Sequence, residues 1–423
     1  LAANTLLKAG TAIGTSSNAI ELSTDQLSSA SRNGGTFLSE ANAVTVTGLS
    51  LVGQRVDSTG ANAAMAADVQ EDLRTLGTAS VLSLTAGGTL TVMGGASTGT
   101  PNAGVVATGS ILLATTGTGS NLVLTSSVNS TTGDISLNSS GNVNLSSQVT
   151  PASIGSISTS AAGKTIDVRA SGDITMASGA LTSTTNGHVR FEAQSGNITV
   201  SDITAGTGSV ALIAGGALID GDAGTDGTDI TAASLYLSAA TGIAQSGNAL
   251  DTAVGTLAFT AAAGGAYVSE LDAVTSGAVT VSVNRVGNDG TTTAVSGSWE
   301  DWRTTGTNTA LRVTAAGSIT LNGGSGTADA AVVGSGSVQI QTSGASSDLT
   351  LNASVSSQAS SVSLNAGGQL VLAAGGDVTA SGGGASLQSG AALTMNSTVG
   401  TTRSERSVVA AGDVSLRSGA TDR

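Results

Sequence analysis

A short unit recurs along this sequence: a Gly, a small polar residue, and then a run that alternates apolar and polar residues. It reads Gly-Asp-Ile-Ser-Leu at 133–137 and Gly-Asn-Val-Asn-Leu at 141–145, and further copies begin at Gly172, Gly196, Gly208, Gly317, Gly336, Gly376 and Gly412. Gly accepts the backbone angles of a tight corner, and a period of two places alternate side chains on opposite faces of a strand. Each unit therefore predicts a turn followed by a short strand.

A strand with two inward side chains cannot fold by itself and must stack on copies of itself. The chain has only three Phe, two Tyr and two Trp, so its interior has to be narrow enough for Val, Ile and Leu to fill. We expect an all-β fold, a right-handed parallel β-helix (β-solenoid) with about 20–24 residues in each of roughly 20 coils. Asn follows the last apolar residue of several units, as at Asn322 and Asn352, and stacked Asn side chains can form hydrogen-bonded ladders.

Composition and charge argue against several classes of protein. The chain has 39% apolar residues and two Pro, which is not the composition of a disordered chain. A net charge of −14 with no basic stripe argues against nucleic acid as a partner. The absence of Cys excludes disulfides and thiolate metal sites, and no run of 18 apolar residues predicts a membrane span. Since the sequence begins at Leu1, we expect a processed product or a piece of a longer protein.

One stretch without the repeat, Ala61 to Leu76, predicts a short amphipathic helix. Its apolar residues recur at helical spacing with charged residues between them: Met65, Val69, Leu73 and Leu76. We expect this helix to pack on the side or over one end of the solenoid; the alternative is a helix that binds a partner.

The predicted domain organisation follows from these interruptions. Residues 1–80 are expected to form N-terminal coils that carry the helix at about 61–76. Residues 81–423 are expected to form the main solenoid, with loop insertions at about 220–229 and 284–303.

The insertion at 220–229 carries four carboxylates in a Gly-rich segment: Asp220, Asp222, Asp226 and Asp229. Carboxylate oxygens at alternating positions can bind calcium. No Glu closes the loop as it would in an EF-hand, so the alternative is a solvated loop between coils. Apart from this possible calcium, we expect no cofactor.

The insertion at 284–303 contains both Trp residues of the chain, Trp299 and Trp302. An exposed Trp can stack on a sugar or anchor a protein interface. The alternative is that these side chains fill a wide place in the core.

The residues that catalysis would need are scarce, so we expect no enzyme activity. The single His, His188, lies within a strand pattern and has no second His for a zinc site. A polysaccharide lyase or glycosidase is the enzymatic alternative, because parallel β-helices host those activities. Such a site needs clustered carboxylates. Its candidates would be Asp134, Asp173 and Asp377, each beside a turn Gly but in a different coil.

The Gly-Asp/Asn-Ile/Val-x-Leu-Asn pattern, over roughly residues 80 to 420, resembles the repeat region of filamentous-haemagglutinin-like bacterial exoproteins, the adhesins of two-partner secretion. The resemblance implies a right-handed β-helix at the cell surface that serves attachment or biofilm formation. The secretion-domain motifs of that family are not evident in residues 1–92, which favours a middle or C-terminal segment.

The function that we expect is an extracellular fibre segment or adhesin, a rod that contacts host or matrix glycans or proteins. Two alternatives remain open. Terminal coils expose strand edges, so the chain could associate with itself end to end and build a matrix filament. The second alternative is the polysaccharide-active β-helix enzyme.

Overall fold

The structure is a computed structural model and describes residues 2–94, 103–149, 152–222, 227–324, 330–396 and 407–419. Within these ranges it contains strands and no helix. Forty-two strands pair in parallel, and eight form four antiparallel two-stranded sheets. The chain divides into two compact units: unit 1 is Leu1–Gln194 with Val283–Val295, and unit 2 is Ser195–Ser282 with Ser296–Arg423.

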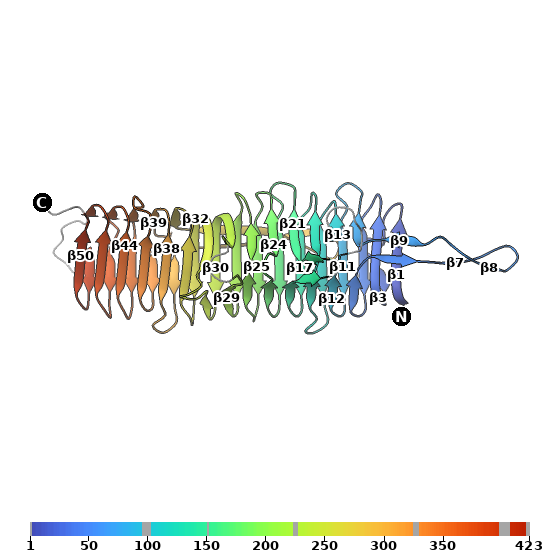
Figure 1. Ribbon diagram of the computed structural model, residues 1–423, viewed down its shortest axis with the longest axis horizontal. Helices are drawn as coiled ribbons and strands as arrows, with labels where there is room; N and C mark the ends of the chain where they lie inside the picture. Colours follow the sequence, from blue (N-terminus) through green and yellow to red (C-terminus); the bar gives the residue numbers. More distant parts are fainter. Residues whose placement is uncertain are drawn as a thin grey trace. The chain divides into compact units, whose positions relative to one another are not determined.

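The parallel strands of unit 1 form three stacks, which Figure 1 shows as neighbouring strands in blue to green. The first contains β1 (Ala2–Ala9), β3 (Thr24–Ser31), β10 (Leu73–Thr75), β13 (Ala103–Ala107), β16 (Ser127–Ser130), β21 (Ser156–Thr159) and β24 (Leu181–Thr184). The second contains β2 (Ile20–Leu22), β4 (Thr36–Glu40), β11 (Leu82–Ala86), β14 (Ile111–Thr115), β17 (Ile135–Ser139), β22 (Ile166–Ala170) and β25 (Val189–Ala193). The third contains β5 (Val44–Val46), β12 (Leu90–Val92), β15 (Leu122–Leu124), β18 (Val143–Leu145) and β23 (Ile174–Met176).

Unit 2 is built in the same way. One stack contains β27 (Asp202–Thr204), β30 (Ile230–Ala239), β32 (Leu250–Ala261), β37 (Trp302–Thr304), β40 (Ala330–Gly334), β43 (Ser354–Ser357), β46 (Val378–Ala380) and β49 (Val408–Ala410), and β28 (Ser209–Ala214) also pairs with β30. The next contains β26 (Ile198–Val200), β29 (Ala217–Asp220), β31 (Gly242–Ile243), β33 (Ala266–Glu270), β38 (Leu311–Ala315), β41 (Val338–Thr342), β44 (Val362–Ala366), β47 (Ala385–Ser389) and β50 (Val414–Ser418). The third contains β34 (Val274–Ser276), β39 (Ile319–Leu321), β42 (Leu349–Leu351), β45 (Leu370–Leu372) and β48 (Leu393–Met395).

Side chains of one type align from coil to coil and fill the narrow interior. In unit 1, Ile111, Ile135, Ile166 and Val189 are consecutive partners, and all four are fully buried. In unit 2, Val313, Ile340, Leu364 and Leu387 form an equivalent ladder. The predicted parallel β-solenoid architecture is therefore confirmed, while its right-handedness stays a prediction.

Coil length varies along the chain. Ile111 pairs with Ile135, 24 positions on and within the predicted 20–24, whereas Ile135 pairs with Ile166, 31 positions on. The longer coil accommodates an extra antiparallel hairpin, β19 (Ser147–Val149) with β20 (Ala152–Ile154). The predicted Asn ladder is present at one place, where the Asn352 amide donates to the Asn322 side chain at 2.8 Å.

The helix predicted at 61–76 is wrong. The segment contains β8 (Asn62–Ala64), β9 (Asp68–Gln70) and all of β10, and β8 and β9 pair antiparallel with β7 (Gln54–Val56) and β6 (Leu49–Leu51) respectively. Of the four apolar residues at helical spacing, only Leu73 is buried, and it is a core residue of β10. The other three are exposed and do not form a buried stripe, so their helical spacing in the sequence did not reflect a helix packed on the core. We call residues 49–70 the first hairpin.

The insertion predicted as a loop at 284–303 is mostly a second hairpin, residues 279–299. It consists of β35 (Val279–Val286) and β36 (Thr292–Trp299), which form a two-stranded sheet. Its turn passes through Gly290 at φ 81°, and the first hairpin turns at Gly60 with φ 83°. Both angles lie in the left-handed region that Gly occupies at little cost.

The two hairpins belong to two copies of one larger module, residues 2–92 and 232–321. Up to the hairpins, each residue of the first module corresponds to the residue 230 positions later in the second. After the hairpins, the corresponding residue lies 229 positions later. Shared segments include Gly34-Gly35 and Gly264-Gly265, Arg55-Val56 and Arg285-Val286, and the Asp-x-Arg-Thr-x-Gly-Thr sequences that begin at Asp72 and Asp301.

The backbone repeats along with the sequence. Asp72 has φ 63° and Asp301 has φ 67°, and each forms an ion pair with the Arg two residues later. Glu40 and Glu270 are each 2% exposed. Asn42 and Asp272 donate backbone N–H groups to these two carboxylates respectively. The chain is thus repetitive at two levels, the single coil and the module of several coils.

Candidate functional site

The tip of the second hairpin packs against the coils of unit 1. Val286 is 2% exposed and forms an apolar cluster with Leu112 and Ala114 on β14. The Val286 backbone N–H donates to the Ser136 hydroxyl at 2.8 Å. Ser136 lies on the opposite face of β17 from Ile135 and Leu137, and it is 2% exposed where the hairpin contacts it.

A buried carboxylate fixes the hairpin tip by charge. Asp167, whose side chain is 1% exposed, accepts from Arg285 Nε at 2.6 Å and from Arg190 Nη1 at 3.2 Å. Its two oxygens thus meet two guanidinium groups, one from the hairpin and one from β25. A charge-assisted pair of this kind is stronger than a neutral hydrogen bond, and each partner becomes costly to remove.

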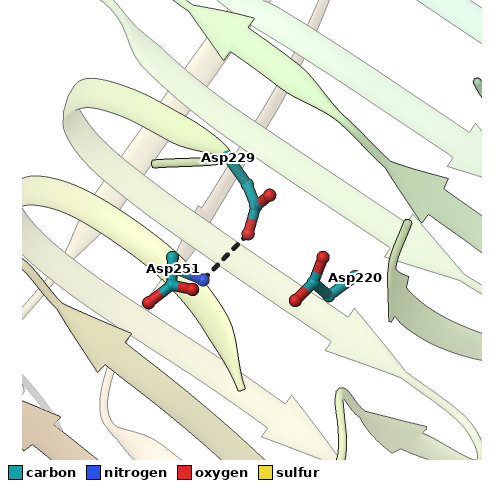
Figure 2. Close-up of side chains that lie close together, drawn as sticks. All are labelled: Asp220, Asp229 and Asp251. Carbon is teal, nitrogen blue, oxygen red and sulfur yellow. Dashed lines mark hydrogen bonds between the residues drawn. The ribbon is translucent and has the colours of Figure 1, made fainter. Parts of the chain in front are cut away.

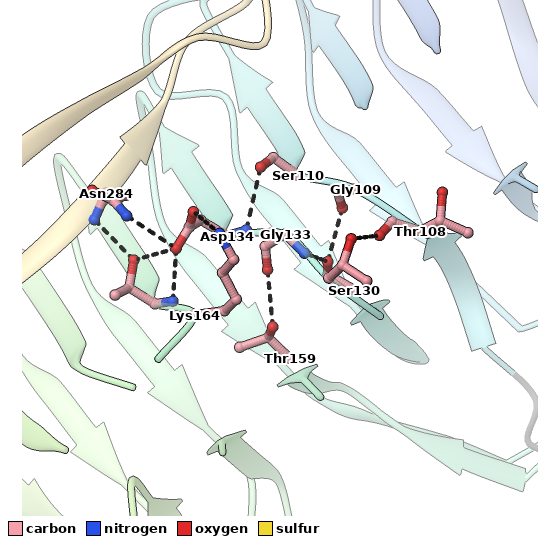
Figure 3. A network of polar contacts seen from close by, with 11 residues as sticks. Thr108, Gly109, Ser110, Ser130, Gly133, Asp134, Thr159, Lys164 and Asn284 are labelled. Carbon is pink, nitrogen blue, oxygen red and sulfur yellow. Dashed lines mark hydrogen bonds and ion pairs between the residues drawn. The ribbon is translucent and has the colours of Figure 1, made fainter. Parts of the chain in front are cut away.

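Asp134 is a second buried anchor for the hairpin tip. Its side chain accepts from the Thr165 backbone N–H at 2.8 Å and hydroxyl at 2.9 Å, and it forms an ion pair with Lys164 at 3.6 Å. Asn284 of the hairpin reaches the same group at 3.3 Å, as Figure 3 shows. These contacts give Asp134, one of the candidates for catalysis, a structural role.

Between the hairpin tip and the coils of unit 1 lies a pocket of about 500 Å³. Leu112, Ala114 and Val286 contribute apolar surface to it. Arg169 and Arg285 line it as well, and their side chains are 34% and 35% exposed. An apolar wall with a few convergent charged donors is typical of a ligand site.

Two of the four carboxylates predicted to bind calcium lie together. Asp220 and Asp229 meet Asp251, with ligand atoms of all three within 4.8 Å of one another. Figure 2 shows the three side chains, with the Asp251 backbone N–H donating to Asp229 at 2.9 Å. Asp222 instead accepts from the Ser201 hydroxyl at 3.1 Å, and Asp226 lies outside the described residues. Calcium at this cluster stays a prediction.

The remaining sequence candidates lie in separate places. The backbone N–H of Asp173 donates to the Asn142 side chain of another coil at 2.8 Å. Burial raises the pKa of Asp377 in unit 2. The backbone carbonyl of His188 accepts from the Ile166 N–H at 3.0 Å, so this residue contributes to pairing of the coils.

The two Trp side chains have different surroundings. Trp302 is 0% exposed, stacks on Phe259 at 5.8 Å between ring centroids, and donates to the Leu257 carbonyl at 2.8 Å. It therefore fills the core and is not available as a surface anchor. Trp299 is half-buried and stacks on Tyr236 at 4.1 Å.

Glu270 is a buried carboxylate that sequence reasoning missed. It accepts from the Thr252 hydroxyl at 2.7 Å and the Val254 N–H at 3.1 Å. Burial, partly offset by these hydrogen bonds, raises the pKa of Glu270 to about 7. The group therefore titrates near neutral pH, where the unfolded chain's Glu is already ionised.

Glu270 should make the stability of the protein fall as the pH rises from about 4.5 to about 7. In this window the folded state retains a proton that the unfolded state has lost, so a rise in pH favours unfolding. Over the whole window the free energy of unfolding should fall by about 3 kcal/mol at most. Glu270→Gln cannot titrate and should lack this loss. Urea unfolding of both proteins at several pH values checks it, and parallel pH curves would contradict it.

Comparison of the chain with protein families, curated proteins and solved structures finds no match. The fold thus defines the class, a parallel β-solenoid, and the resemblance to filamentous-haemagglutinin-like repeats stays a prediction. In the described ranges, no helix combines the length and the apolar character needed to cross a bilayer.

Proposed function

We propose that this chain is an adhesive segment of an extracellular bacterial surface fibre. Stacked coils present the outer faces of successive strands side by side, and solenoids of this kind use such faces for binding. The chain has no Cys and gains its stability from repeated ladders of aliphatic residues, which suits a surface protein without disulfides. Attachment to host or matrix material at the cell surface would use these exposed faces.

The observation that carries the adhesive role is the pocket beneath the second hairpin. Arg169 and Arg285 line this pocket with side chains that are about one-third exposed, and Arg169 in particular can donate to a carboxylate. Cationic donors at this place stand out in a chain of net charge −14. We therefore propose an acidic glycan as the ligand, bound and released without turnover.

Calorimetry with an oligomer of a uronic acid as the titrant tests this proposal. Arg169→Ala should weaken binding about tenfold, since it removes one charge-assisted contact. Arg32→Ala, which removes an exposed Arg elsewhere in unit 1, should leave binding unchanged. Equal affinity of the Arg169→Ala variant and the unaltered chain would refute the site, and recovery of shortened oligomers would favour the enzymatic alternative.

A further inference from the structure

Three neighbouring hollows on the surface of unit 2 form one groove. The first, of about 380 Å³, and the second, of about 230 Å³, share Asn248 in their linings. The second and the third, of about 510 Å³, share Asp251, Ser269 and Thr314. Because these residues belong to successive coils, the groove crosses several coils and has the length for an extended ligand.

The groove offers hydrogen-bond donors and acceptors close together. The Arg312 guanidinium and the Asn248 amide can donate, the Asp251 carboxylate can accept, and the Ser and Thr hydroxyls can do either. Leu271, which is 64% exposed, lines the third hollow and adds apolar surface. A sugar presents hydroxyl groups that donate and accept at once, next to apolar C–H faces, so this combination fits a glycan.

Arg312 is only loosely held by the protein. Its Nη1 donates to the Ser246 carbonyl at 3.5 Å, the long limit of a hydrogen bond, and its Nε has no hydrogen-bond partner. Within the part of the chain that the structure describes, no carboxylate forms an ion pair with it. The guanidinium therefore keeps donors available for a ligand.

The first module shows that the fold does not require an Arg at this place. Leu82-Ser83-Leu84 of β11 corresponds to Leu311-Arg312-Val313 of β38. In both triplets the flanking aliphatic residues are buried in the core, while the middle residue changes from Ser to Arg. Arg312 thus lines the groove without being part of the repeated architecture.

We infer that this groove in unit 2 binds a neutral glycan. Asp251 lies beside Asp220 and Asp229, with ligand atoms of all three within 4.8 Å of one another, as Figure 2 shows. These carboxylates repel an acidic chain, and Arg312 repels a cationic one. The inference goes beyond the adhesive function proposed above, because it assigns a second site to another class of glycan, and none of the residues that line the groove lines the pocket beneath the second hairpin.

An array of immobilised neutral hexasaccharides of glucose, galactose, mannose and N-acetylglucosamine tests the groove, with a glucosamine hexamer printed beside them. The full chain should bind at least one neutral hexamer. Calorimetry with that hexamer should show about tenfold weaker binding for Arg312→Ser, which removes a charge-assisted contact. This substitution introduces the residue that the first module carries, so the fold should be kept.

Arg417→Ser is the matched control for this change. Arg417 is an exposed residue of β50, in the same stack of strands as β38 but outside the groove, and its replacement should leave binding unchanged. Binding of no neutral hexamer, binding of the glucosamine hexamer alone, or equal affinities of Arg312→Ser and Arg417→Ser would each overturn the inference. Arg169→Ala, which alters the pocket in unit 1, should not affect the neutral hexamer, so the two proposals can fail separately.

Discussion

Replacement of Trp302 with Ala is expected to lower the free energy of unfolding of unit 2 by about 3–5 kcal/mol, as for other large aromatic side chains removed from a core. Trp302 is the largest of the fully buried side chains. Its removal leaves Phe259 without its stacking partner and the Leu257 carbonyl without the indole donor. Urea unfolding, combined with hydrogen exchange of unit 2, measures the loss.

The chain supplies its own control for this change. Leu73 occupies the corresponding position in the first module and is also fully buried. Trp302→Leu should therefore cost less than Trp302→Ala, because a Leu fits the same place in the related coil. A loss below about 1 kcal/mol for Trp302→Ala would show that the neighbouring coils collapse into the space.

The coils could be predicted from the sequence because their signal is local. In a unit such as Gly133 to Leu137, one corner residue and a period of two specify a strand that must stack. The register between coils then follows, because only one register places Ile135 beside Ile111 and Ile166.

The hairpins could not be predicted by the same reasoning. Met65, Val69 and Leu73 have helical spacing, but their burial depends on what lies next to them, and that is decided by distant segments. The sequence contains a stronger signal, the recurrence of whole segments about 230 positions apart, and a search for single-strand repeats overlooked it. A comparison of the two halves would have aligned Arg55-Val56 with Arg285-Val286 and predicted two similar insertions.

The acidic cluster shows the same division between local and distant information. Asp220 and Asp229 were singled out because they lie close in the sequence. Asp251 completes the cluster from β32, which pairs with β30 in the next coil. Asp251 lies 22 positions after Asp229, within the predicted coil length, but the prediction considered only carboxylates that are close in the sequence.

Replacement of Asp167 with Ala is expected to release the tip of the second hairpin and to destabilise unit 1 by about 3–5 kcal/mol. The change removes the carboxylate that pairs with both Arg190 and Arg285, and Arg190 keeps only its pair with Glu192. Removal of one member of a buried charge pair is costly. Arg190 is only 12% exposed, so water can replace little of what is lost. Urea unfolding gives the total cost.

Hydrogen exchange at Val286 tells whether the hairpin has been released. Its N–H donates to the Ser136 hydroxyl, and it should exchange faster in Asp167→Ala, while amides of unit 2 coils far from the hairpin should not change. Glu192→Ala is the matched control, since it removes another carboxylate that pairs with Arg190 but is 25% exposed, and it should cost about 1 kcal/mol or less. If the two variants lose the same stability, the hairpin is held by the apolar contact of Val286 with Leu112 and Ala114, and the buried charge contributes little.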